Sequence, residues 1–315
     1  MNLKFSNARL EYTDDINNAD FVTHNGTFHA DEVFSTIILM GVVDKDIIYI
    51  SRSSDIPNNE KTIVYDVGLG KFDHHQEGGN GMRDNGIKYA SCGLVWREFG
   101  RTYLENVGIT NVDMAWNMVE NAIVQDIDSG DNGQADKEKL YDFEAYGVAD
   151  FVDLFNSNWN EEDRQNDFFI DVVYYMKVLF EKLITRINSK IEAKEIIERS
   201  IENSTDQVIV LDKYLPWKDL VLESENPKSK DLLYIIFPSN RGGYSIYAIP
   251  NKKGSFDVRK EFPKEWAGLR DEELQKVTGV ETARFCHNGR FICTTESLCD
   301  AKEIARKAVD YNLLT

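Results

Sequence analysis

Side chains that bind metals are concentrated in a few short stretches of this 315-residue chain. Four of its five histidines occupy two of these stretches: His24 and His29 in "FVTHNGTFHADE", and His74 and His75 in "KFDHHQEGG". Both stretches also carry aspartate, and neutral imidazole together with carboxylate suits Mn, Zn or Fe better than Mg or Ca. The residue types therefore predict a bound divalent metal.

Further aspartates extend this set to enough ligands for two ions. The predicted metal ligands are His24, His29, Asp31, Asp66, His74, His75 and Asp128. Two ions about 4 Å apart would activate a water and stabilise the oxygens of a phosphoryl transfer. The predicted catalytic residues are His75, Asp66 and Asp73.

Two acidic residues near these ligands have alternative roles. Asp73 is either a direct ligand or a hydrogen-bond partner of a histidine. Glu32 is interpreted as a charge in the first turn of a helix, with support of a ligand as the alternative.

The elements around these residues predict an α/β fold. The segment "ADFVTHNG" has the pattern of a strand that ends near His24, and "ADEVFSTIILMGVV" has the apolar spacing of a helix. The runs "KDIIYISRS" and "TIVYDVG" are typical of buried parallel strands, and Asp66 ends the second. His24 and Asp66 are thus expected at neighbouring strand tips, where sites form in such sheets.

Composition shifts along the chain predict two domains, 1–203 and 204–315. Residues 161–203 contain no proline or glycine and predict one or two long amphipathic helices. Strand-like segments with turn residues between them follow residue 204, which indicates a smaller α+β domain.

Global composition narrows the class of protein. A net charge of −18 argues against coating nucleic acid by bulk electrostatics, although it leaves room for an anionic substrate at a local site. Four scattered cysteines argue against a disulfide framework. We expect a cytoplasmic protein without membrane segments, since neither a long apolar run nor a secretory leader is evident. Its oligomeric state is left open, with a homodimer among the alternatives.

These motifs, in this order, resemble the MYG (melanocyte proliferating gene) family of metal-dependent hydrolases, which is related to the DHH phosphoesterases. "THNGTFHADE", "VYDVG…KFDHHQ" and "ASCGLVWREFG" are similar to successive family motifs, and "DVRKEFPKEWAGLRDEEL" and "FCHNGRF" extend the resemblance to the C-terminal part. Two departures stand out. Ala30 occupies a position where cysteine is common, and the last metal motif, commonly Asp-Asn-Gly, is interpreted as "DSG" from Asp128 to Gly130.

The resemblance implies a DHH-like N-terminal domain with a mostly parallel sheet flanked by helices, a smaller C-terminal substrate-binding domain, and a site in the cleft between them. It also implies two divalent ions, with manganese favoured and Mg, Zn or Fe as alternatives. The implied activity is hydrolysis of phosphodiester bonds, as a 3′→5′ exonuclease on RNA. Short RNA, DNA or a nucleotide would be the substrate. Its contacts would come from Arg259, His287, Asn288 and Gly289.

Several roles remain open at the level of sequence. Arg259 is either a phosphate ligand or a surface charge, and Trp266 either stacks on a base or belongs to the core. The same metals also suit a pyrophosphatase-like or small phosphate-ester hydrolase. A non-catalytic metal- or nucleotide-binding protein is the third alternative.

Overall fold

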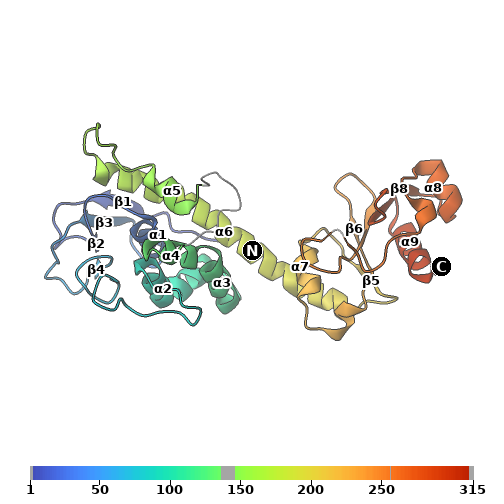
Figure 1. The fold of residues 1–315 in the computed structure, drawn as a ribbon, viewed down its shortest axis with the longest axis horizontal. Helices are drawn as coiled ribbons and strands as arrows, with labels where there is room; N and C mark the ends of the chain where they lie inside the picture. The colour runs from blue at the N-terminus through green and yellow to red at the C-terminus, as the bar shows by residue number, and fades with distance from the viewer. Residues whose placement is uncertain (1–2, 136–145, 256, 312–315) are drawn as a thin grey trace. The chain divides into compact units, whose positions relative to one another are not determined.

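The computed structural model describes residues 3–135, 146–255 and 257–311. Its internal contacts divide the chain into two compact units, Met1–Ser189 (unit 1) and Lys190–Thr315 (unit 2), both drawn in Figure 1. The division falls inside the long helix α6 (Gln165–Glu202), so this helix contributes to both units. The predicted domain division after residue 203 follows the end of α6 and stays a prediction.

The sheet of unit 1 is parallel throughout its described strands. Its four strands lie in the order β1 (Arg9–Tyr12), β3 (Ile47–Arg52), β2 (Phe21–Thr23) and β4 (Ile63–Val64). All three strand pairs run in the same direction. The predicted parallel α/β architecture is confirmed, and parallel pairing brings the carboxyl ends of β2 and β4 to the same edge of the sheet.

In unit 1 the first helix lies between β2 and β3 in sequence, and the other helices follow β4. These helices are α1 (Ala30–Met40), α2 (Ser91–Val107), α3 (Val112–Val119), α4 (Gln125–Asp131) and α5 (Val148–Asp153), with a π-helical turn, Glu120–Val124, between α3 and α4. Every residue of α1 is buried. This burial includes Asp31 and Glu32, so their charges need partners inside the protein.

Aromatic contacts connect α6 to the earlier helices of unit 1. The ring of Phe180 in α6 packs edge-on against Phe34 of α1 at 5.9 Å between ring centroids, and against Trp96 of α2 at 6.2 Å. All three side chains are almost completely buried. The predicted long helix over 161–203 is thus present as one helix, and its first part holds α1 in place.

Unit 2 is built on a mixed five-stranded sheet. The strand order is β5 (Val208–Val210), β6 (Tyr234–Pro238), β7 (Tyr244–Ala248), β9 (Ile292–Thr295) and β8 (Ala283–Cys286). Among the described strand pairs of this sheet, β5 and β6 are parallel and the other three pairs are antiparallel. The helices are α7 (Trp217–Leu222), α8 (Asp271–Thr278) and α9 (Leu298–Asp310), with short 3₁₀ turns at Pro227–Lys230 and Lys264–Trp266. The expected α+β organisation is confirmed.

Two hydrophobic clusters cover the two faces of this sheet. One contains Ile304 of α9 and the buried Trp266, and the other contains Ile197 of α6 and Trp217 of α7. Trp266 therefore belongs to the core, which resolves the alternative left open by the sequence.

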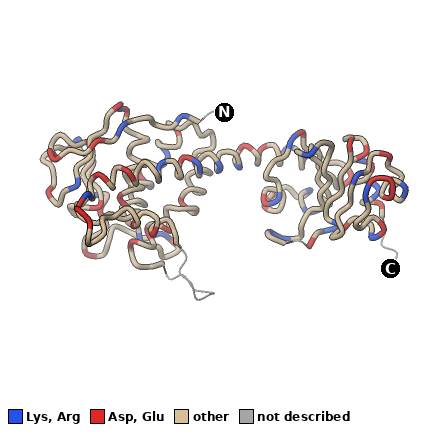
Figure 2. The backbone as a smooth tube through the Cα atoms, turned by 90° about the horizontal axis from the view of Figure 1, so that it is seen from above, with Lys and Arg blue, Asp and Glu red and all other residues tan. Residues whose placement is uncertain are grey.

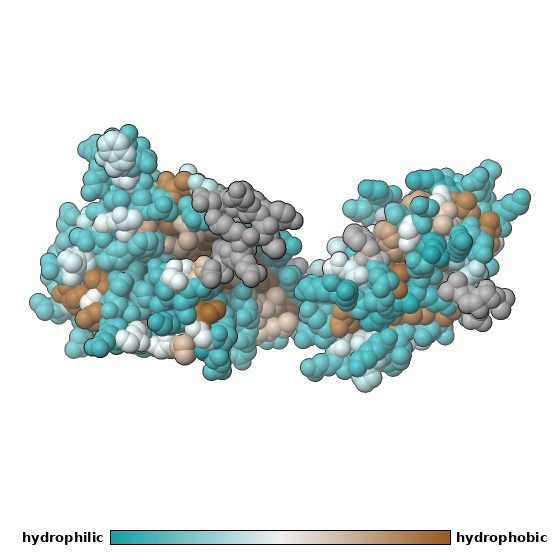
Figure 3. All heavy atoms as spheres, in the orientation of Figure 1, coloured by the Kyte–Doolittle hydropathy of each residue, from teal (hydrophilic) through white to brown (hydrophobic). Residues whose placement is uncertain are grey.

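The surface is polar and acidic. Acidic positions occur along both units, in keeping with the net charge of −18 (Figure 2). The face shown in Figure 3 is mainly hydrophilic. Among the described residues, no helix has both the length and the apolar content needed to cross a membrane.

Candidate metal centre

The site begins at the carboxyl ends of two neighbouring strands. His24 directly follows β2, and Asp66 follows β4 by two residues. Because β2 and β4 pair in parallel, the two side chains meet: His24 Nε2 lies 3.4 Å from Asp66 Oδ2. Asp66 has the left-handed backbone conformation, with φ at 56°, which turns the chain away from the strand and leaves its carboxylate at the tip.

The segment between the two N-terminal histidines forms the first ligand group. His29 is the N-cap of α1, and its backbone N–H donates to Glu32 Oε1 at 2.9 Å. The same Oε1 lies 2.9 Å from His24 Nε2. One ligand atom from each of His24, His29 and Glu32 lies within 4.8 Å of the others, so this turn can hold one ion.

Two further groups adjoin the first through Asp66 and His74. Asp66, His74 and His75 form one group, and Asp31, His74 and Asp131 form the other, again within 4.8 Å. Asp66 Oδ1 lies 3.4 Å from His74 Nε2, while its Oδ2 faces His24. The two oxygens of Asp66 therefore face different ligand groups, as a carboxylate that bridges two ions would.

The amino end of α2 fixes the buried Asp31. Its two oxygens accept hydrogen bonds from the backbone N–H groups of Ser91 at 2.9 Å and Cys92 at 2.6 Å. The hydroxyl of Ser91 donates to Asp66 Oδ1 at 3.2 Å. The first turn of a helix carries unpaired N–H groups and a positive dipole end, so α2 holds acidic side chains that would otherwise repel each other.

Asp128 and Asp131, both in α4, take different positions. The carboxylate of Asp128 accepts from Gly93 N–H at 2.9 Å and forms an ion pair with Arg83 at 2.7 Å. Asp131 Oδ2 instead lies 3.0 Å from His74 Nε2 and lines the opening of the site. The ligand role of Asp128 stays a prediction, but the described ligand groups contain Asp131 in its place.

Asp131 and Glu32 are the residues that the sequence-based ligand set lacks. Asp131 begins the triplet "DNG", which matches the Asp-Asn-Gly motif directly and was the signal available in the sequence. An acidic residue such as Glu32 is also favourable in the first turn of a helix, so its type and position in the sequence do not reveal that it belongs to a ligand group. Only the fold shows its carboxylate facing His24.

Asp73 holds His75 instead of joining a ligand group. The Asp73 Oδ1 lies 2.7 Å from His75 Nδ1 and also accepts a hydrogen bond from the backbone N–H of His75. The Asp73 Oδ2 accepts a hydrogen bond from the backbone N–H of Leu69 at 2.6 Å. These bonds lower the pKa of the Asp73 carboxyl despite its burial. Asp73 therefore occupies the position that fits its hydrogen-bonding alternative.

The electrostatics of the site show concentrated negative charge. Burial and then the charges of Asp66 and Asp131 raise the pKa of Asp31 well above its usual range. Burial would lower the pKa of His24, but hydrogen bonds to Asp66 and Glu32 outweigh it and raise the pKa to about 11. The pKa of His74 rises to about 11 in the same way, through Asp131 and Asp66. Protons on these histidines thus balance carboxylates in the absence of another cation.

The residues present fit divalent ions. Glu32 Oε2 is buried and has no hydrogen-bond partner among the described residues. The opening has a volume of about 690 Å³, and none of the described residues that line it is Lys or Arg. Its charged lining consists of carboxylates and histidines, so an anionic substrate needs added cations there. Histidine nitrogen combined with carboxylate oxygen suits Mn, Zn or Fe.

A buried arginine supports the loop that carries the first histidines. Arg52, at the end of β3, donates from its guanidinium to the carbonyl of Gly26 at 2.7 Å. The guanidinium carbon lies 5.4 Å from the ring centre of Phe28 and 4.8 Å from that of Phe169. This stacking and hydrogen bonding restrict the turn between His24 and His29.

The predicted substrate contacts lie in unit 2. A guanidinium nitrogen of Arg259 donates to the carbonyls of Ser229 at 2.5 Å and Leu232 at 2.8 Å, which gives this arginine a structural contact. His287 and Asn288 begin the turn between β8 and β9, where Gly289 N–H donates to His287 Nδ1 at 2.9 Å. Their substrate roles stay predictions.

Comparison with known proteins agrees with this arrangement of motifs. A sequence model of the MYG1 exonuclease family, described as an uncharacterised protein family (UPF0160), matches residues 20–309. The chain belongs to the MYG1 exonuclease family. It is 29% identical over 299 residues to the MYG1 protein of Dictyostelium discoideum, covering 86% of this chain and 90% of that relative. It is 28% identical over 307 residues to the MYG1 exonuclease of Rattus norvegicus, covering 86% and 79%. No solved structure matches the chain.

Proposed function

We propose that the protein is a divalent-metal-dependent phosphodiesterase that removes nucleotides from the 3′ end of RNA. The observation that carries this proposal is the position of Asp66, whose two oxygens face His24 on one side and His74 on the other. The relatives from Rattus norvegicus and Mus musculus that are named MYG1 exonuclease support an exonuclease.

In this proposal the ligand groups divide between two ions. His24, His29 and Glu32 would hold one, Asp31, His74 and Asp131 would hold the other, and Asp66 would be shared. Bound ions would supply the positive charge that attracts a phosphate and stabilises the attacking and leaving oxygens. Manganese suits the mixed nitrogen and oxygen donors, and Mg, Zn or Fe are the alternatives.

His75 is the candidate for moving a proton. It lines the opening, and its Nδ1 is held by Asp73 Oδ1 at 2.7 Å. With the Nδ1 proton directed to Asp73, Nε2 can accept a proton from a water or return one to a leaving oxygen. Asp73 orients the ring and fixes its tautomer, so its effect on hydrolysis would act through His75.

The deciding experiment combines metal reloading with a substrate panel. Protein stripped with EDTA is reloaded with Mn²⁺, Mg²⁺, Zn²⁺ or Fe²⁺ and given end-labelled RNA, end-labelled DNA, a dinucleotide and pyrophosphate. We expect stepwise loss of nucleotides from the 3′ end of RNA with Mn²⁺. Asp66→Asn should lower the rate at least 100-fold, on the order of the loss when a key electrostatic group is removed.

The exposed Asp55, which follows β3, provides a matched control as Asp55→Asn. Full activity of Asp66→Asn would contradict the proposal. Release of phosphate from pyrophosphate without release of nucleotides would favour the pyrophosphatase-like alternative.

A further inference from the structure

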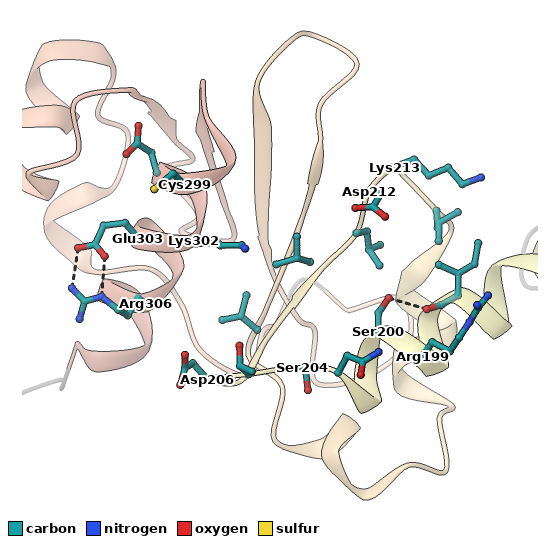
Figure 4. Close-up of a pocket in the computed structure, with 18 residues that line it drawn as sticks. Arg199, Ser200, Ser204, Asp206, Asp212, Lys213, Cys299, Lys302, Glu303 and Arg306 are labelled. Atoms are coloured by element: carbon teal, nitrogen blue, oxygen red, sulfur yellow. Dashed lines mark hydrogen bonds and ion pairs between the residues drawn. The ribbon is translucent and has the colours of Figure 1, made fainter.

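Unit 2 contains a groove, about 1110 Å³ in volume, that has no part in the metal centre. We call it the β5 groove. It is lined by Arg199 and Ser200 of α6, by Val208 and Val210 of β5, and by Lys302 and Glu303 of α9. Figure 4 shows β5 running between the end of α6 on one side and α9 on the other.

The strand in this groove has an open edge. β5 is the first strand of its sheet, β6 is its partner among the described strands, and Val208 at its start is also bridged to Thr205 of the preceding turn. The backbone N–H of Leu211 donates to the carbonyl of Ile236 in β6 at 2.8 Å. The odd-numbered residues of β5 and the residue after it therefore direct their backbone groups toward β6. Backbone groups alternate along a strand, so the N–H and the carbonyl of Val210 face the groove, whereas the Val208 N–H already donates to the Thr205 carbonyl at 3.0 Å.

The opposite edge of the same sheet is covered. There, Cys286 N–H donates to the carbonyl of Leu269 at 3.0 Å, and Gly268 N–H donates to the carbonyl of Cys286 at 3.1 Å. This segment closes the outer edge of β8. Proteins commonly cover the edges of sheets because the unpaired backbone N–H and carbonyl groups of an edge strand can pair with a further strand. Within the described part of unit 2, β5 is therefore the edge available for pairing.

The charges of the groove argue against a nucleic acid. Its lining contains four basic and four acidic residues, which are Arg199, Lys213, Lys302, Arg306, Asp206, Asp212, Asp300 and Glu303. Affinity for a phosphate backbone rests on an excess of positive charge, and this lining has none. The balance suits a polypeptide with few charges.

Among the basic residues of this lining, Lys302 is directed toward β5 (Figure 4). Glu303 is already paired with Arg306 at 2.8 Å, and Asp300 accepts from the hydroxyl of Thr282 at 2.5 Å. Lys302 has no ion-pair partner among the described residues, and Figure 4 shows its side chain directed from α9 toward β5. An acidic side chain on a segment that pairs with β5 would complement it.

The position of β5 between two helices selects the shape of the occupant. A second copy would have to bring its own β5, which is recessed between the same two helices, into contact with this one. An extended segment is slim enough to enter. We propose that the β5 groove binds an extended segment of another protein, which adds a strand to β5 and places an acidic residue against Lys302.

This proposal is independent of the metal centre and is tested on the full-length protein. A displayed library of random nine-residue peptides is selected on the protein, and enriched peptides are measured by fluorescence anisotropy. We expect enrichment of β-branched residues around a central Asp or Glu. Val210→Pro removes the outward N–H while proline remains tolerated at an edge strand, so it should weaken binding at least tenfold. Lys302→Glu should do the same.

Two controls separate binding in the groove from other effects. Lys276→Glu makes the same charge change on α8, outside the groove lining, and should leave affinity within twofold. Cys299 lines the groove and is the exposed cysteine of the four, so bound peptide should slow its alkylation. Failure to enrich any peptide would overturn the proposal. So would peptides that bind Val210→Pro with unchanged affinity, or protection of Cys299 by an RNA oligonucleotide and not by peptide.

Discussion

Asn156 pairs with both backbone hydrogen-bonding groups of Phe28. Its side-chain oxygen accepts from the Phe28 N–H at 3.0 Å, and its side-chain nitrogen donates to the Phe28 carbonyl at 2.9 Å. Phe28 is fully buried and immediately precedes His29. Asn156 follows α5, more than one hundred residues later, so a distant part of unit 1 sets the position of a proposed metal ligand.

Replacing Asn156 with alanine should weaken metal binding without unfolding the protein. The change leaves the N–H and carbonyl of Phe28 without partners and lets the His24–His29 turn move. Loss of groups that orient metal ligands typically lowers affinity about 10–100-fold. Titration of EDTA-stripped protein with Mn²⁺ or Co²⁺ measures this affinity. Asn158→Ala is the control, because Asn158 lies in the same loop and its side chain is hydrogen-bonded, among the described residues, to the exposed Glu161 alone. Equal affinities for the two variants would contradict this role.

The two aspartates of α4 can be distinguished by metal content. Asp131→Asn should lower the amount of metal retained after dialysis, because Asp131 lies beside His74, whereas Asp128→Asn should retain it. Elemental analysis of both variants gives the answer. The opposite result would restore the sequence-based assignment of Asp128 as the ligand.

Gly93 should be intolerant of any side chain. A Cβ at this position would lie 1.9 Å from Asp128 Oδ2 and 2.7 Å from a guanidinium nitrogen of Arg83. We expect Gly93→Ala to lower the free energy of unfolding by about 3 kcal/mol or more, since it breaks a buried ion pair. Urea unfolding measures the change. Gly130→Ala is the matched control, because a Cβ there meets nothing within 4 Å and should be neutral or slightly stabilising. Similar losses in both variants would contradict the steric explanation.

Asp128 should make the stability of the metal-free protein depend on pH. Burial raises the pKa of its carboxyl to about 7 against an ordinary value of 3.8, even though Arg83 stabilises its charge. Arg83 also pairs with the buried Glu120, so one cation serves two carboxylates. Between about pH 4 and pH 7 the folded state binds a proton that the unfolded state has released. The free energy of unfolding due to this group therefore falls as pH rises through that range.

Urea unfolding of wild-type protein and Asp128→Asn at pH 5 and at pH 7.5 isolates this effect. The wild type should lose more stability across the interval than the variant, since all other groups titrate in both. Asp113→Asn, an exposed aspartate, serves as the control and should parallel the wild type. If Asp128→Asn lost as much stability as the wild type between pH 5 and pH 7.5, Asp128 would be ionised throughout this range.

The fold followed from sequence where patterns were local. Apolar runs that end at His24 and Asp66 predicted parallel strands with reactive tips, because strand direction and period determine where side chains meet. The length of α6 followed from the absence of proline and glycine. The histidines were informative because they are rare in this chain.

The distribution of carboxylates could not be predicted in the same way. Asp128 and Asp131 are three residues apart on α4, and a π-helical turn just before them changes which residues face the site. Which of them meets Arg83 and which meets His74 depends on packing against α2 and on a loop far away in sequence. The partner of Glu32 could not be predicted either, because an acidic residue is equally expected in the first turn of a helix without any metal nearby.

The continuity of α6 affects any attempt to study the parts of this protein separately. Phe169 and Phe180 in its first part are buried in unit 1, while Ala193, Ile197 and Ile201 contribute to the core of unit 2. A short helix without its neighbouring turns forms poorly in water because nucleation is costly. Cutting the gene at codon 190 would leave unit 2 with a frayed helix end and an exposed apolar stripe. A cut within α6 or at either of its ends therefore removes part of the core of at least one unit, so proteolysis there should not release two soluble fragments.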